Sequence, residues 1–261
     1  MNKTDIYAEL DSPEYKDEMQ KTISMRISMI ECLLFCYMDT ARDSESAQNN
    51  FMLRLFDDLI QSVTSVEHLA RQGFMNNCKR ELRYLLELAL KANFIVRSAF
   101  SDDFESQVKK FEKMLNSSNI NPINKLPISY LDQVQETEFK TSVKELYGFL
   151  CKYVHASTHQ IQERVSLAAK GRTIGYEGTD ALKELNGLLE SVYSSVIVLL
   201  FNSLPQHVAG DFLVHEDGGI VNWYFNQSRF VAMIDTKFDY KYERQNKLKE
   251  LTETRLSMVR F

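Results

Sequence analysis

A scarcity of helix-breaking residues is the feature that most constrains the fold of this chain. The 261 residues include 9 glycines and 4 prolines, whereas average usage would give roughly 18 and 13. Glycine adds backbone freedom and proline removes a hydrogen-bond donor, so both interrupt helices. We therefore expect an all-α fold, specifically an antiparallel bundle of long helices with a four-helix core and extra helices at both ends.

Apolar residues recur at helical spacing through most of the chain. Ser12 followed by Pro13 predicts the start of the first long helix. The stretch 42–50 is polar, and 116–129, which contains two prolines, is the clearest predicted linker. Further helices are predicted at about 52–70, 74–100, 102–115, 139–153, 158–170, 179–204 and 240–258. We expect three parts: an N-terminal amphipathic helix over 1–44, a helical bundle over 45–205 and a helical extension over 206–261.

Composition argues against several classes of protein. The net charge is −5, with both signs interspersed, so no global positive field holds a nucleic acid and any RNA contact must be local. The longest apolar run, 196–201, is far short of the ~20 residues that a bilayer span needs. The N-terminal residues lack the apolar stretch of a secretory signal. We therefore expect a cytoplasmic protein without membrane contact.

The cysteines and the acidic residues do not form an obvious metal site. Four cysteines lie in apolar-periodic segments, which is typical of reduced, buried thiols; they are Cys32, Cys36, Cys78 and Cys151. A polar cluster of four residues before two glycines suits either an oxygen-rich metal site or a turn; it comprises Asp211, His215, Glu216 and Asp217. We expect no metal and no cofactor. Trp223, Tyr224 and Phe225 either dock a partner or fill a core.

Three charged residues form a polar ribbon on an otherwise apolar helix. Arg83, Glu87 and Lys91 are spaced at i, i+4 and i+8. One interpretation is the solvated edge of a core helix. The other is that the ribbon faces a neighbouring helix, where Arg83 can bind phosphate and Glu87 can hold a partner in position.

A histidine follows the helix predicted at 139–153. A rotation of about 100° per residue places His155 opposite the apolar stripe that includes Leu146. Gly148, on the same side as His155, suggests close approach by another backbone or a ligand. The alternative is a histidine near a helix C-terminus, where the dipole favours its charged form. Ser157 and Gln160 have the spacing of a capping box that starts the next helix.

Two stretches together resemble the paired signatures of HEPN-type helical bundles. They are 83–91 (RYLLELALK) and 147–157 (YGFLCKYVHAS). The resemblance is to the abortive-infection and uncharacterised bacterial branches of that superfamily, and it covers about 45–205. It implies a metal-independent RNA endonuclease or toxin of bacterial stress or phage defence, in which an arginine and a histidine from paired helices act on the RNA phosphodiester.

The sequence departs from the arginine–histidine motif of that superfamily. The motif arginine would stand at 148–150, which here reads Gly-Phe-Leu. Arg83 or Lys152 would then have to supply the cation, while His155 acts as general acid or base and the RNA 2′-hydroxyl attacks. The predicted catalytic residues are His155, Arg83, Glu87, Lys152 and Tyr147, followed by His159 and Ser157.

The missing motif arginine and the negative net charge of the chain support a different function. The alternative is a non-catalytic helical interaction module, or scaffold, that binds a partner protein. Expected partners are a second copy of the chain, RNA, and an antitoxin or other defence-system protein. We expect the homodimer to form on the face of Lys144, Gly148, Cys151 and His155, because Gly148 leaves room for a facing helix.

Overall fold

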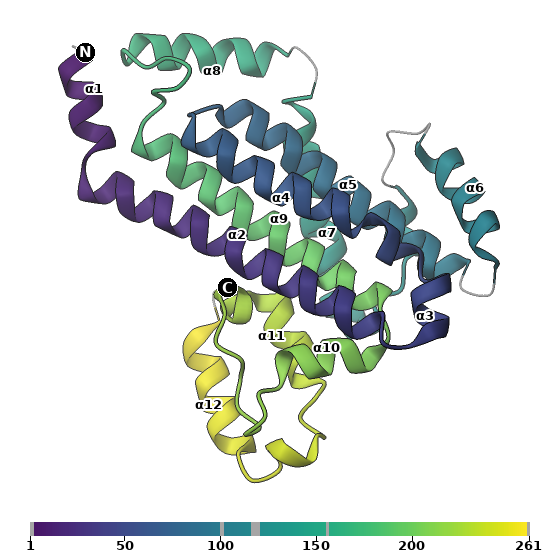
Figure 1. Ribbon diagram of the computed structural model, residues 1–261. Helices are drawn as coiled ribbons and strands as arrows, with labels where there is room; N and C mark the ends of the chain where they lie inside the picture. Colours follow the sequence, from purple (N-terminus) through teal and green to yellow (C-terminus); the bar gives the residue numbers. More distant parts are fainter. Residues whose placement is uncertain (1–2, 100–101, 116–120, 155–156, 260–261) are drawn as a thin grey trace.

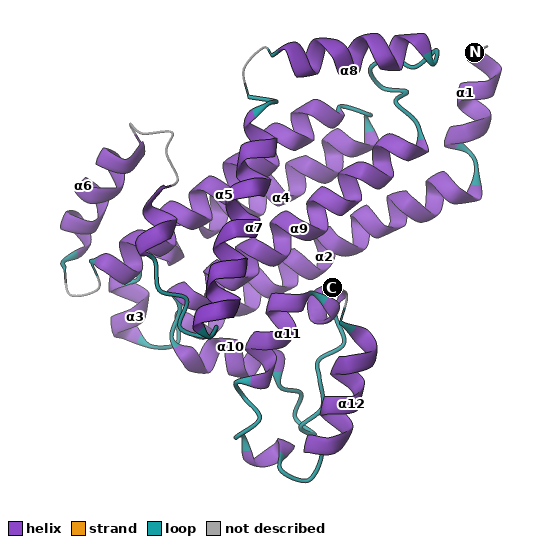
Figure 2. Cartoon of the chain, turned by 180° about the vertical axis from the view of Figure 1, so that it is seen from behind, coloured by secondary structure: helices purple, strands orange, loops and turns teal. Residues whose placement is uncertain are grey.

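The protein is all-α, as predicted. The computed structural model describes residues 3–99, 102–115, 121–154 and 157–259. These residues contain twelve α-helices and four short 3-10 helices. Within them there is no β-strand, only the isolated bridges Thr173–Tyr176 and Val214–Ile220 (Figure 2).

The described residues form the following helices in chain order. The α-helices are α1 (Lys3–Leu10), α2 (Pro13–Thr40), α3 (Ser44–Asn49), α4 (Phe56–Arg71), α5 (Met75–Ser98), α6 (Phe104–Leu115), α7 (Gln133–Cys151), α8 (Thr158–Ala169), α9 (Thr179–Ser203), α10 (Gln206–Leu213), α11 (Arg229–Thr236) and α12 (Leu248–Met258). The 3-10 helices are η1 (Phe51–Leu55), η2 (Asn121–Lys125), η3 (Tyr224–Gln227) and η4 (Tyr242–Arg244).

The core is a layer of long helices. α5 packs against α4, α7 and α9, and α2 packs against α4 and α9 (Figure 1). Fully buried aliphatic side chains fill the space between them; examples are Met29, Val63, Leu85, Val196 and Leu199. The expected four-helix core within 45–205 is not confirmed, because α2 comes from the segment before residue 45 and packs directly on α9.

One core helix has the length and composition of a membrane span. Among the described helices this is α9, and 67% of its most apolar window is buried inside the bundle. Such burial is typical of the central helix of a globular bundle, because a helix that is apolar on all sides must be covered by protein or by lipid.

Several local predictions are confirmed and others are wrong. The Ser12 hydroxyl accepts a hydrogen bond from Tyr15 N at 3.2 Å and caps α2, as predicted. The polar stretch 42–50 contains the short helix α3, which Asp43 caps. The predicted linker is not a free connection: it contains η2, and its apolar side chains at Ile123, Leu126 and Ile128 are buried.

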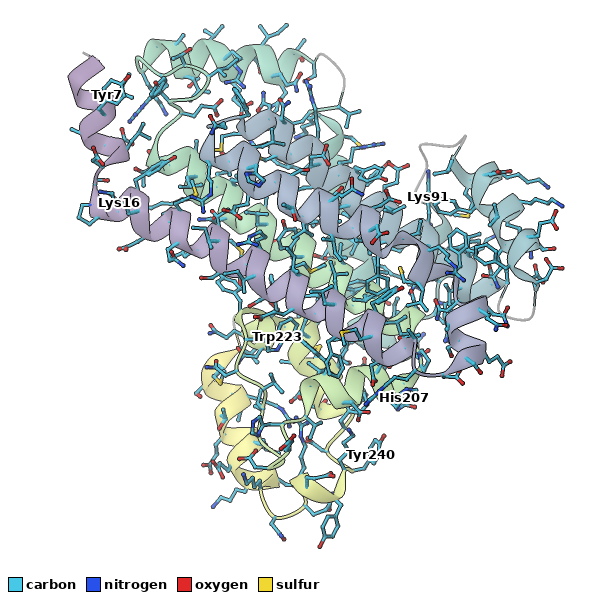
Figure 3. The ribbon with its side chains drawn as sticks, viewed as in Figure 1. Tyr7, Lys16, Lys91, His207, Trp223 and Tyr240 are labelled. Atoms are coloured by element: carbon cyan, nitrogen blue, oxygen red, sulfur yellow. The ribbon has the colours of Figure 1, made fainter. Side chains whose placement is uncertain are left out.

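The C-terminal helices form a smaller unit against α2 (Figures 1 and 2). The predicted aromatic cluster belongs to its core: the Trp223 and Phe212 ring centroids are 4.8 Å apart, and the Phe212 ring contacts Phe35 of α2. Figure 3 shows Trp223 between α2 and the C-terminal helices. The sequence predictions missed α10 and α11 and started the last helix too early, since α12 begins at Leu248.

Candidate functional site

The polar ribbon of α5 faces α7. The Arg83 guanidinium donates to the Tyr147 hydroxyl oxygen at 2.8 Å and pairs with Glu87 at 2.9 Å. The Tyr147 hydroxyl in turn donates to Glu87 Oε2 at 3.2 Å. Lys91 Nζ lies 2.6 Å from the other oxygen of Glu87. Of the predicted site residues, Arg83, Glu87 and Tyr147 are therefore in contact, and the ribbon is not a solvated edge.

This cluster is largely closed to solvent. The Arg83 side chain is 16% exposed and that of Lys91 is 3% exposed. Burial, followed by the negative charge of Glu87, raises the pKa of the Tyr147 hydroxyl, which therefore stays protonated at neutral pH. The Glu87 carboxylate lies between two cations and neutralises much of their field. Glu87 would therefore compete with a phosphate group for the Arg83 guanidinium.

The remaining predicted residues are not joined to this cluster by the described contacts. His155 lies outside the described residues. The helical rotation used to place it does not apply, because α7 ends at Cys151. The Lys152 ammonium lies over the Phe149 ring, 5.3 Å from its centroid. Gly148 is exposed, and no described atom, apart from its own helix backbone and sequence neighbours, lies within 4 Å of a Cβ built there. No contact within the described chain explains Gly148.

The segment between α7 and α8 is tied to α5. The Tyr153 carbonyl accepts hydrogen bonds from Arg80 Nε at 2.7 Å and Gln160 Nε2 at 3.0 Å. The Ser157 hydroxyl caps α8 by accepting from Gln160 N at 3.2 Å. The predicted capping box is thus half correct, because the Gln160 side chain binds Tyr153 instead of Ser157. A complete capping box, Asp132 with Gln135, starts α7 and was not predicted.

A second charged cluster, which sequence reasoning missed, is centred on Lys79. Its ammonium lies 3.1 Å from Glu163 of α8 and 2.9 Å from Glu184 of α9. It also donates to the Tyr153 hydroxyl oxygen at 3.2 Å, and that hydroxyl is 3.0 Å from Nε2 of His159. One signal for it was present in the sequence: position 79 extends the spacing 83, 87 and 91 by one further turn of the same helix.

The Lys79 cluster keeps a buried cation charged. The Lys79 side chain is 3% exposed, and burial alone would lower its pKa. The hydrogen bond with Glu184 and the charges of Glu184 and Glu163 outweigh burial and raise the pKa above its ordinary value. Removing either carboxylate would leave the buried ammonium with less charge compensation.

The charged face of α8 points toward the bundle. Glu163 pairs with Lys79, and Arg164 pairs with Glu177 of the loop before α9 at 2.5 Å. None of the residues of α8, all of which the structure describes, is buried. Ile161 and Val165 are 63% and 65% exposed. Together with exposed uncharged neighbours they form what we call the outer face of α8: Thr158, Ile161, Gln162, Val165, Ser166, Ala168 and Ala169.

Two of the acidic candidates near the C-terminus, Asp211 and Asp217, are engaged in ion pairs. Asp217 contacts His215 at 2.9 Å and Lys247 at 3.1 Å, and Asp211 contacts Lys241 at 2.6 Å. Within the described part of the chain, no three His, Cys, Asp or Glu side chains gather so that they could hold a metal ion. These contacts favour the polar turn over the metal site, the two alternatives that the sequence left open for this cluster.

No family model, curated protein or solved structure matches this chain. The resemblance to HEPN-type bundles is therefore untested and stays a prediction.

Proposed function

We propose that this protein is a non-catalytic helical interaction module that binds a partner protein through the outer face of α8. The observation that carries the proposal is the orientation of α8. An amphipathic helix on a bundle normally turns its apolar stripe inward and its charges outward. Here Ile161 and Val165 point to solvent, while Glu163 and Arg164 form ion pairs with the bundle.

The chemistry of the outer face suits a protein partner. Its seven residues, all within the described chain, carry no charge. Depletion of charged residues is the compositional mark of protein interface cores. A nucleic acid or an anionic lipid surface would instead require lysine or arginine at the contact. The net charge of −5 also disfavours binding to a nucleic acid or an anionic lipid surface, both of which are negatively charged.

The position of α8 supports the same proposal. α8 lies at the edge of the molecule, outside the layer of long helices (Figures 1 and 2). Its links to the bundle include polar contacts of Glu163, Arg164 and the Gln160 side chain. The His159 ring also packs edge-on against the Phe149 and Tyr153 rings. A partner can therefore cover the outer face without displacing any contact of the core.

Site-specific photo-cross-linking tests the proposal. A photoreactive amino acid is placed at Val165, and a matched control carries it at Val134 of α7, which is 68% exposed. Both proteins are irradiated alone and in an extract of the source cells. We expect discrete protein adducts from position 165 and few from position 134. Equal adducts from both positions, or none from position 165, would contradict the proposal.

One observation favours the second candidate function, the metal-independent endoribonuclease. Arg83, Glu87 and Tyr147 are joined by hydrogen bonds between α5 and α7, which supply the two resembling stretches. On this hypothesis His155 and Arg83 act on an RNA phosphodiester. The test is cleavage of a mixed RNA substrate in the presence of a metal chelator. Activity that His155→Ala abolishes, with helicity unchanged, would support the nuclease; no cleavage by the parent protein would refute it.

A further inference from the structure

We propose that the partner covering the outer face of α8 is a second copy of this chain, with the two α8 helices packed antiparallel about a two-fold axis through Val165. This inference rests on the proposed function and makes it specific. A two-fold contact uses the same patch on both copies, so the patch must be complementary to itself in charge and in shape.

The orientation of α8 makes its outer face compatible in charge with the same face of a second copy. Both charged residues of this described helix, Glu163 and Arg164, are already paired within their own copy. Two outer faces can therefore meet without bringing like charges together, although each copy carries a net charge of −5. The exposed charge next to the helix, Lys170, lies across from the uncharged Gln160 in this arrangement.

Shape complementarity follows from the order of large and small residues. In an antiparallel pair centred on Val165, Ile161 of each copy lies opposite Ala169 of the other, because the two positions are equidistant from the centre. A large side chain then meets a small one at both ends. Ser166 and Ala168 are also small, which allows the helix axes to approach to the ~8–10 Å of packed helices.

The size of the face sets the strength of the dimer. α8 has 12 residues and is therefore roughly 18 Å long at 1.5 Å per residue. A single helix of this length offers less than the ~800 Å² per partner that stable complexes bury. We therefore expect a reversible, concentration-dependent dimer with a micromolar dissociation constant.

Sedimentation velocity of the full chain over a range of micromolar concentrations tests the inference. The parent protein is expected to shift from monomer to dimer as concentration rises. Val165→Glu should raise the dissociation constant at least ~100-fold, because two carboxylates would meet at the axis. Val134→Glu, at an equally exposed valine of α7, should leave dimerisation unchanged. Both positions are exposed, so both variants are expected to fold, which circular dichroism checks.

A third variant separates this dimer from the one expected on α7. Gly148→Leu fills the open space beside that helix and should not change a dimer built on α8. If Gly148→Leu dissociates the dimer and Val165→Glu does not, the α8 arrangement is wrong. A parent protein that stays monomeric throughout would also overturn it. In that case, adducts from position 165 that form in extract and not in the purified protein would leave the proposed function standing.

Discussion

The ammonium of Lys79 lies 3.1 Å from a carboxylate oxygen of Glu163, and this ion pair joins a buried lysine of the core to a helix whose described residues are all at least partly exposed. Further polar contacts hold α8: Arg164 pairs with Glu177, and the Gln160 side chain binds the Tyr153 carbonyl. The ring contacts of His159 with Phe149 and Tyr153 add to them. A helix with few buried apolar contacts opens at a low free-energy cost. α8 is therefore attached to the bundle without being part of its core.

Loss of the Glu163 carboxylate is expected to release α8. Glu163→Gln removes the ion pair from the α8 side, while Lys79 keeps Glu184. The bundle should stay folded, and trypsin should cleave after Arg164 several-fold faster than in the parent protein. The matched control is Glu184→Gln, which removes the other carboxylate of Lys79 and leaves the contact with α8. Equal cleavage rates in both variants would show that this ion pair does not hold α8.

The cysteines are expected to differ sharply in reactivity. Cys32, Cys36 and Cys78 are buried free thiols, as predicted, whereas Cys151 is half-buried. Burial raises the pKa of the Cys78 thiol to about 12, and only the thiolate reacts. Iodoacetamide at mildly alkaline pH should therefore modify Cys151 first, as peptide mass spectrometry would show. In denaturant all four should react, and native labelling of Cys78 as fast as that of Cys151 would contradict the buried core.

The C-terminal unit depends on a buried charge network. Arg244 is fully buried and binds Asp235, both at its carboxylate (2.6 Å) and at its carbonyl (2.8 Å). Arg244→Met leaves the buried Asp235 carboxylate with Arg255 as its cation. Breaking a buried pair costs about 3–5 kcal/mol when the remaining charge has no partner. Because Arg255 still compensates Asp235, we expect a measurable loss below that range in urea unfolding. Fluorescence of Trp223, the single tryptophan, reports on this unit.

A matched control separates burial from charge. Lys109 and Glu105 form an ion pair in which both side chains are mostly exposed. Lys109→Met should leave the urea midpoint unchanged, because exposed pairs contribute little. An equal effect of the two substitutions would mean that the Arg244 network is not a structural element of the C-terminal unit.

The long core helices could be predicted closely from the sequence. The predicted range 179–204 compares with Thr179–Ser203 for α9, and 74–100 compares with Met75–Ser98 for α5. Strong apolar periodicity defines both helices, and Gly178 and Pro205 mark the ends of α9. Local chemistry therefore sufficed for these elements.

The end of α7 could not be predicted in the same way. No proline or glycine interrupts the chain between Cys151 and His155. The helix ends where Arg80 of α5 and Gln160 of α8 bind the Tyr153 carbonyl. A contact between distant segments therefore decides this boundary, and the predicted direction of His155 depended on it.

The orientation of α8 could not be predicted from the sequence either. Periodicity identifies an apolar stripe through Ile161 and Val165, but it does not say on which side of the helix the rest of the protein lies. That side is set by Lys79 and Glu177, which lie on other elements and pair with Glu163 and Arg164. The candidate interaction surface follows only from the assembled fold.

Hydrogen exchange of the α8 backbone as a function of protein concentration tests the account most directly. If two copies pair through the outer face, amides of Thr158–Ala169 should exchange more slowly at high micromolar concentration than at low concentration. Amides of Gln133–Cys151 should be unaffected, and Val165→Glu should abolish the protection. Exchange of α8 at one rate at every concentration, in the parent protein and the variant alike, would contradict the proposed pairing.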